Sequence, residues 1–171
     1  MADTLDPALP REVQDRANRV LELACDKERY LATAESCTGG LLAALLTDVP
    51  GCSHVFERGF VVYSNEAKCD LLGIARAKVD SCGAVSEEVA REMALGALRR
   101  SNAQLAVSIT GYAGPPGEDD DGEEGLVHFA CAADGGTLDH REEHFGDIGR
   151  DGVRIASLEV ALEMLEVALK R

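Results

Sequence analysis

Three side chains of this sequence have the types that nucleophilic catalysis needs: Ser36, Tyr63 and Lys68. A serine hydroxyl is a weak nucleophile at its own pKa and needs a base within hydrogen-bond reach, such as a lysine whose pKa is lowered by burial. Ser36 follows a short apolar run, Tyr63 ends a second one, and Lys68 lies one turn into the next predicted helix. These residues could therefore serve as nucleophile, relay and base. The structural alternative is that Ser36 caps a helix, Tyr63 packs and Lys68 is solvated.

Residues that could bind an anion stand near both ends of the chain. Thr38, Gly39 and Gly40 open a predicted helix, where free backbone amides suit a phosphate, a carboxylate or a developing oxyanion. Arg150 and Arg154 are four residues apart and share one face of the last predicted helix. They could clamp an anion or serve only as helix surface.

Cysteine chemistry at the same corner is less favoured than serine chemistry. Cys37 follows Ser36 directly. Successive residues that leave a strand point in different directions, so only one of the two can face a common site. We expect Cys37 to be packed.

Metal and cofactor sites are not predicted. His140 and His144 lie on a predicted strand, about 13 Å apart at roughly 3.3 Å per residue, which is too far to share one ion, and we expect both at the surface. The acidic run at 119–124 lacks the ligand spacing of an EF-hand and indicates a solvated loop. The sequence also lacks G-x-x-x-x-G-K-[ST] and G-x-G-x-x-G, so no nucleotide cofactor is indicated.

Composition limits the partners and the compartment. The chain has 171 residues and a formal net charge of -14, which argues against nucleic-acid binding because that requires clustered Lys and Arg. Its six cysteines form no C-x-x-C pair, and no signal peptide or long apolar run is present. These features predict a cytoplasmic protein with no membrane association.

The elements that must position these residues alternate along the chain. After a flexible tail at 1–9, residues 10–171 are expected to form one domain. Helices are predicted from Pro10 to about Lys27, over 39–46, after Ser64, over 86–100 and over 150–170; strands are predicted over 30–35, 57–64 and 104–110, with a hairpin over 125–145. The order predicts an α/β fold, a three-layer α/β/α sandwich on a mixed, mostly parallel five-stranded sheet. Ligands of such folds bind beyond the carboxyl ends of the parallel strands, so the polar strand ends should meet there.

Six segments together make the sequence similar to a known family. They are AESCTGG, FERGFVVYSNEAK, LLGI, GAVSEEVAREMALGAL, SITGYAGPPG and FGDIGRDGVR. In these segments the chain resembles the CinA carboxy-terminal domain family. The resemblance implies a nicotinamide mononucleotide deamidase of the pyridine nucleotide cycle, which releases nicotinate mononucleotide and ammonia without a cofactor. It also implies a stand-alone form and a homodimer or larger homo-oligomer.

The resemblance assigns roles to individual residues. It implies a serine nucleophile at Ser36, with Tyr63 and Lys68 as the matching tyrosine and lysine. The residues that match the family's substrate-binding motifs are Thr38, Gly39, Gly40, Thr110, Gly111, Gly114, Arg150 and Arg154.

One segment departs from the family pattern. Relatives follow the A-G-P loop with Lys-Pro-[VI]-G-x-V, whereas this chain has Gly-Glu-Glu-Gly-Leu-Val at 122–127. Acidic groups near the site weaken the attraction for a phosphorylated substrate if the loop folds inward. Two alternatives therefore stand beside the deamidase: an inactive or retuned homologue that binds a nucleotide as a regulatory module, and an amidase for a non-phosphorylated substrate.

Overall fold

The computed structural model describes residues 9–118 and 120–171. Its α-helices are α1 (Arg11–Asp26), α2 (Leu41–Thr47), α3 (Asn65–Leu72), α4 (Arg76–Cys82), α5 (Glu87–Arg99) and α6 (Gly149–Lys170), with a short 3-10 helix η1 (Ser53–Val55). Its strands are β1 (Leu31–Glu35), β2 (Phe56–Val61), β3 (Leu105–Gly111), β4 (Leu126–Ala133) and β5 (Leu138–His144). The predicted elements are all present, and the sequence patterns missed η1 and α4.

The five strands form one mixed sheet in the order β2-β1-β3-β4-β5. The pairs of β1 with β2 and with β3 are parallel, and those of β4 with β3 and with β5 are antiparallel. Only β4 therefore opposes the other strands. The carboxyl ends of β1, β2 and β3 consequently lie at one edge of the sheet.

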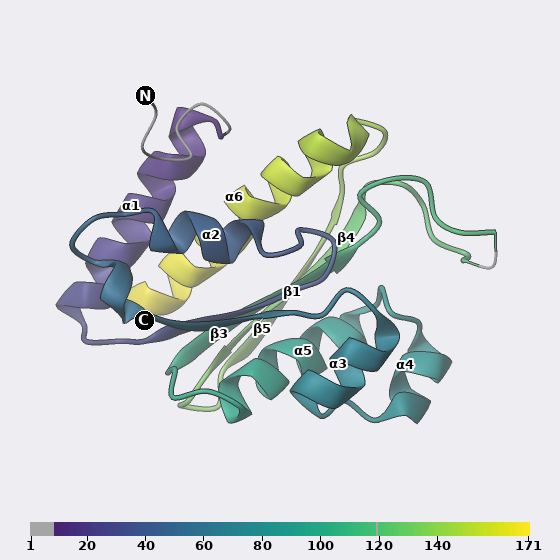
Figure 1. Ribbon diagram of the computed structural model, residues 1–171, viewed down its shortest axis with the longest axis horizontal. Coiled ribbons are helices and arrows are strands. Elements are labelled where there is room, and N and C mark those ends of the chain that lie inside the picture. Colours follow the sequence, from purple (N-terminus) through teal and green to yellow (C-terminus); the bar gives the residue numbers. More distant parts are fainter. Residues whose placement is uncertain (1–8, 119) are drawn as a thin grey trace.

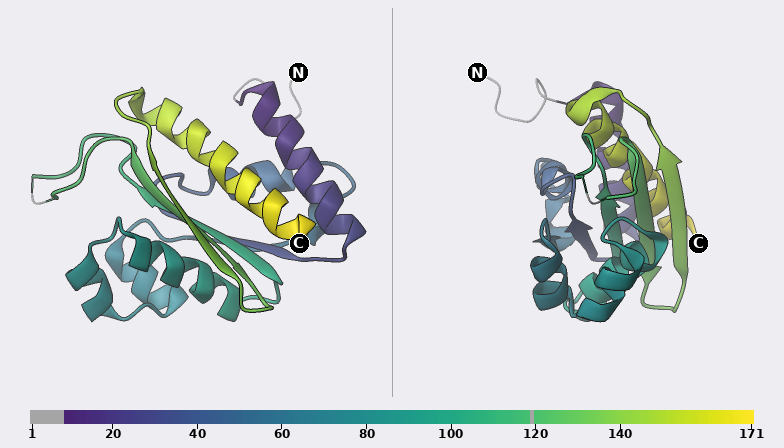
Figure 2. Two further views of the ribbon diagram at one scale, coloured as in Figure 1. Left: turned by 180° about the vertical axis from the view of Figure 1, so that it is seen from behind. Right: turned by 90° about the vertical axis from the view of Figure 1, so that its right-hand side faces the viewer.

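Helices cover both faces of the sheet, as Figures 1 and 2 show. One face carries α1, α2 and α6, and the other carries α3, α4 and α5. The predicted three-layer α/β/α sandwich is thus confirmed. No helix in the described ranges is long and apolar enough to cross a membrane.

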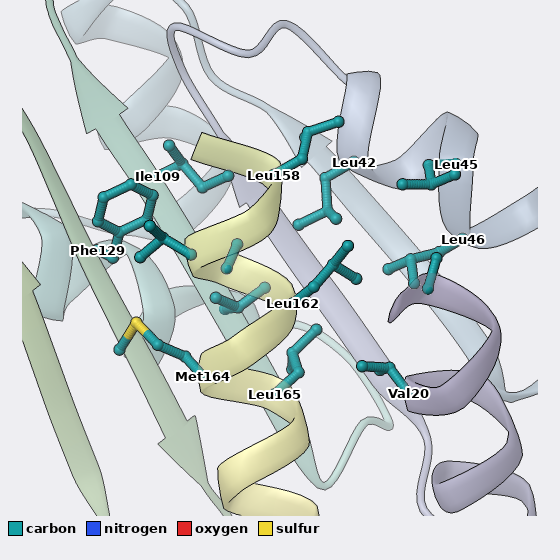
Figure 3. Packing of buried hydrophobic residues seen from close by; sticks show 14 of the residues in the cluster. Val20, Leu42, Leu45, Leu46, Ile109, Phe129, Leu158, Leu162, Met164 and Leu165 are labelled. Atoms are coloured by element: carbon teal, nitrogen blue, oxygen red, sulfur yellow. The ribbon is translucent and has the colours of Figure 1, made fainter. Parts of the chain in front are cut away.

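The larger core lies between α6, α1, α2 and the sheet (Figure 3). The helical spacing of Val13, Ala17, Val20, Leu21 and Ala24 predicts one apolar stripe on α1, and all five residues are buried. The same spacing places Val153, Ala156, Val160, Met164 and Val167 on one face of α6, but this prediction is partly wrong because Val167 is 46% exposed and Ala156 is only half-buried. The helix instead buries Leu158, Leu162 and Leu165, which point between α1, α2 and β3. A long helix packed between a sheet and other helices buries more than one narrow stripe.

Two serine side chains cap helices next to the strand ends. The Ser64 side chain accepts a hydrogen bond from the Ala67 N–H at the start of α3, and Ser86 accepts one from the Val89 N–H at the start of α5. Each cap satisfies an N–H group that has no partner within its own helix.

The connection from β3 to β4 extends away from the body of the protein (Figure 1). Its base is fixed by two backbone hydrogen bonds, from Tyr112 N–H to the Leu126 carbonyl at 2.9 Å and from Gly125 N–H to the Tyr112 carbonyl at 2.8 Å. We call the described residues 112–118 and 120–125 the acidic arm. Of the predicted flexible tail at 1–9, residues 1–8 lie outside the described residues, whereas Leu9 is buried against the larger core and is not part of a free tail.

Candidate active site

A hollow of about 260 Å³ lies where the carboxyl ends of β1, β2 and β3 meet. Its lining includes seven of the predicted site residues: Ser36, Tyr63, Lys68, Thr110, Gly111, Gly114 and Arg150. Segments that are far apart in the sequence therefore meet here, as the parallel topology predicts. The other four, Thr38, Gly39, Gly40 and Arg154, are not part of this lining.

The centre of the hollow is a contact between Ser36 and Lys68. The Nζ atom of Lys68 lies 3.0 Å from Ser36 Oγ, 3.1 Å from the Val62 carbonyl oxygen and 3.4 Å from that of Tyr63. A neutral amine has two N–H donors and one lone pair. The two carbonyls can accept the two N–H groups, which leaves the lone pair to accept the Ser36 hydroxyl proton.

The environment of Lys68 favours its neutral form. The side chain is 1% exposed and forms no ion pair with any residue that the structure describes. Burial lowers the pKa of Lys68 below 10.5, because removing water penalises the charged ammonium. The Ser64 cap starts α3 so that Lys68, one turn later, lies over the end of β1.

Ser36 and Cys37 point to opposite faces of the sheet. Ala32 and Ala34 pack in the core under α3 and α5. Ser36 lies on the same face of the sheet, where its hydroxyl contacts Lys68. Cys37 packs in the larger core beside α2 and α6. Burial raises the pKa of the Cys37 thiol to about 12, so it stays protonated at neutral pH and is a poor nucleophile.

Tyr63 contacts Lys68 through its backbone rather than through its hydroxyl. Its side chain is 68% exposed at the mouth of the hollow, and its hydroxyl forms no hydrogen bond with any described residue. The carbonyl of Tyr63 is the group that faces the amine.

A buried carboxylate, Glu35, organises the corner after β1. Its oxygens accept hydrogen bonds from the Thr38 hydroxyl at 2.7 Å and from three backbone N–H groups at the start of α2, those of Gly40, Leu42 and Ala43. The expectation that the amides of Gly39 and Gly40 are free for an anion is therefore wrong. Glu35 supplies the negative charge that this helix start favours, and Gly39 N–H donates to the Ser36 carbonyl.

The two arginines of α6 reach different places. The Arg154 guanidinium donates to the Thr38 carbonyl at 3.0 Å and lies beside Gly39, and its buried Nε has no hydrogen-bond partner among the described residues. Arg150 lies against Gly114, where an added Cβ would be only 2.8 Å from its Nη2. Arg150 lines the hollow and Arg154 supports the corner behind Ser36, so a joint clamp is not formed.

The lining also contains Cys37, which we expected to be packed, and seven residues that sequence reasoning did not name as site residues: Asn65, Ala84, Val85, Tyr112, Ala113, Pro115 and Asp120. Asn65 directly follows Ser64, and Tyr112 lies two residues beyond the predicted strand over 104–110, so a wider window at each strand end would have found them. Asp120 lies in the run interpreted as a solvated loop.

The histidines required one correction. His140 is not a surface residue, because its side chain is 12% exposed and its Nε2 lies 3.1 Å from His128 Nδ1. His144 is exposed as predicted. Across the described ranges, no group of three or more His, Cys, Asp or Glu side chains is arranged to hold a metal ion.

A second hollow of similar size lies at the opposite end of the sheet. Its charged lining is mostly paired internally, Arg29 with Asp134 and Arg171 with Asp139. It contains no pair of nucleophile and base, so the Ser36 hollow is the stronger candidate.

Residues 13–169 match the model of the CinA C-terminal domain family. The chain belongs to this family. It is 48% identical over 136 residues to the Escherichia coli K12 protein named nicotinamide-nucleotide amidohydrolase PncC, covering 79% of this chain and 81% of that protein. It is 49% identical over 143 residues to a CinA-like protein of Syntrophomonas wolfei, covering 83% of this chain but only 34% of that longer relative.

Solved structures of family members share the fold. The competence/damage-inducible protein from Agrobacterium tumefaciens superposes with a TM-score of 0.90 at 45% identity, over 95% of this chain and 98% of the other. The Escherichia coli CinA superfamily protein superposes with a TM-score of 0.84 at 31% identity, over 93% and 90%.

Proposed function

We propose that this protein is an amidohydrolase that converts nicotinamide mononucleotide to nicotinate mononucleotide and ammonia. The observation that carries the proposal is the contact between Ser36 and the buried Lys68 amine in the hollow at the strand ends. The name of the Escherichia coli relative supports the substrate, because that protein matches most of this chain.

The proposed reaction begins with proton transfer from Ser36 to neutral Lys68. The Ser36 oxygen attacks the carboxamide carbon, and the resulting tetrahedral intermediate expels ammonia as the C–N bond breaks and Lys68 returns the proton to the leaving nitrogen. Water, deprotonated by the same amine, then attacks the acyl-enzyme ester, and Lys68 returns this proton to the departing Ser36 oxygen. The acid product loses its proton to solvent and leaves as the carboxylate.

The oxyanion of this intermediate needs donors near Ser36. Within the described chain, the backbone N–H groups of Cys37 and Thr38 donate to no other backbone group. Cys37 directly follows the nucleophile and lines the hollow, whereas Thr38 is buried outside the lining, so we assign the oxyanion to the Cys37 N–H. Arg150, at the rim of the hollow, is our candidate for the substrate phosphate.

Ammonia release from nicotinamide mononucleotide tests the proposal. We expect purified, chelator-treated protein to release ammonia and Ser36→Ala to lose at least about 1,000-fold in rate while keeping its fold and its affinity for the substrate. Cys37→Ala is the matched control, because it changes the neighbouring nucleophile, and we expect it to stay active. Retention of more than a few per cent of activity by Ser36→Ala would exclude the mechanism.

Absence of ammonia release by the parent protein would favour the alternatives. Nucleotide binding without release would indicate a regulatory module, and release from nicotinamide alone would indicate an amidase for non-phosphorylated substrates. We place the activity in the cytoplasm and in a homodimer or larger assembly, and sedimentation of the purified protein tests the assembly.

A further inference from the structure

The hollow that contains Ser36 is lined by charges of both signs. Arg150 contributes a guanidinium from α6, and Asp120 contributes a carboxylate from the acidic arm. The acidic arm contains no Lys or Arg in its described residues, and it contributes a carboxylate to the lining. The proposed reaction assigns no role to the carboxylate of Asp120.

Local contacts hold Asp120 at the hollow. Its carboxylate accepts a hydrogen bond from Gly117 N–H at 3.3 Å, and its own N–H donates to the Gly117 carbonyl at 3.0 Å. Its carboxylate also interacts with the hydroxyl of Tyr112, whose pKa is raised by burial first and then by the charge of Asp120. Tyr112 is itself fixed at the base of the arm and lines the hollow.

The surroundings strengthen the negative potential at this position. Glu118, Asp121, Glu123 and Glu124 share the arm, and the whole chain carries a formal net charge of -14. Side chains of one sign around a hollow focus the field there and raise the local concentration of the opposite charge. Arg150 is the permanently charged cation of the lining as the structure describes it, since Lys68 is neutral in the proposed mechanism.

The proposed substrate carries charges of both signs. Its amide is attached to an N-alkylated pyridine ring with one positive charge, and its phosphate is negative. We propose that Asp120 is a specificity-determining residue that favours substrates whose amide-bearing ring is positively charged. This inference rests on the proposed function: Arg150 faces the phosphate, and Asp120 stabilises the cationic ring by charge.

The test compares nicotinamide mononucleotide with its 1,4-dihydro form, whose ring is neutral. Dissociation constants for both are measured by calorimetry in the Ser36→Ala background, which removes turnover, with and without Asp120→Asn. Glu118→Gln is the matched control, because it removes one charge from the same arm at a residue outside the lining. Ammonia release by the protein with Ser36 intact is measured in parallel.

We expect the parent site to bind the cationic form more tightly than the neutral form. Asp120→Asn should weaken binding of the cationic form about fivefold and change that of the neutral form less than about twofold. Glu118→Gln should change both less than about twofold. If Asp120→Asn leaves the ratio of the two dissociation constants unchanged, the inference is wrong. It is also wrong if Asp120→Asn binds the cationic nucleotide more tightly, because Asp120 would then only repel the phosphate.

The outcomes separate this inference from the proposed function. If the protein releases ammonia from the mononucleotide but Asp120→Asn leaves the ratio of the two dissociation constants unchanged, the proposed function holds and the role of Asp120 is wrong. If the protein neither binds nor deamidates the mononucleotide, both proposals are wrong.

Discussion

The amine of Lys68 lies 3.0 Å from the hydroxyl oxygen of Ser36, and its two other contacts are the carbonyl oxygens of Val62 and Tyr63. The two residues are 32 positions apart in the chain and come from neighbouring strand ends. No carboxylate of the described residues pairs with this amine, which suits the role of general base that we propose for it.

Replacing Lys68 should abolish turnover without unfolding the protein. Lys68→Met keeps the length and burial of the side chain but removes the base, so we expect the rate of ammonia release to fall by about 1,000-fold. Lys68→Arg should be equally inactive, because a guanidinium does not become neutral. Lys78→Met, at an ion pair with Glu92 far from the hollow, should stay active. Substantial activity in Lys68→Met would show that another group is the base.

The rate should rise with pH on the acidic side of its profile. Burial lowers the pKa of Lys68 from 10.5, and only the neutral amine can accept the Ser36 proton. Activity is therefore present above this lowered pKa and is lost as the pH falls through it. The dependence of kcat/KM on pH measures the effect. A profile that falls with rising pH across this range would contradict the assignment of Lys68 as the base.

Removing the Tyr63 hydroxyl should have a small effect. The contact with Lys68 uses the backbone carbonyl, so Tyr63→Phe should keep the rate of ammonia release within about threefold of the parent. Tyr30→Phe, an exposed tyrosine outside the hollow, is the control. A loss of 100-fold or more, the usual size for an acid–base group, would restore the relay role that the sequence suggested.

Neutralising Glu35 should affect both stability and catalysis. Glu35→Gln weakens four hydrogen bonds and directs an amide N–H toward backbone donors, which should lower the free energy of unfolding by about 1–3 kcal/mol. Because the corner carries Ser36, kcat should fall more than KM rises. Denaturant titration and ammonia release measure the two effects. Glu12→Gln, exposed on α1, is the control, and equal stability of the two variants would contradict the role of Glu35.

Much of the fold could be predicted because local patterns and tertiary packing agree. The Ser64 and Ser86 caps, the apolar stripe of α1 and the alternation of strands with helices all indicate the same sandwich. The helix α4, of seven residues, was missed because a segment that short has almost no periodicity to detect.

The site was predictable only in part, since spacing alone does not determine which way a side chain points. Strand ends and family motifs indicated Ser36 and Lys68, but the buried Glu35 looked like an ordinary strand residue. Its carboxylate occupies the helix start that Gly39 and Gly40 seemed to offer to a ligand. Which anion fills such a position depends on three-dimensional contacts that no periodic pattern contains.

The position of β2 at the outer edge of the sheet has a consequence for catalysis. The proposed base, Lys68, and its two carbonyl partners follow this strand, while the proposed nucleophile, Ser36, follows the interior strand β1. Val62 N–H donating to the Glu35 carbonyl at 2.8 Å is the last backbone link between them. None of the six residues of β2 is fully buried, and regions with few buried apolar contacts open readily in local unfolding. Opening here would separate the Lys68 amine from Ser36 while the rest of the domain stays folded, so the proposed mechanism depends on the integrity of one peripheral strand.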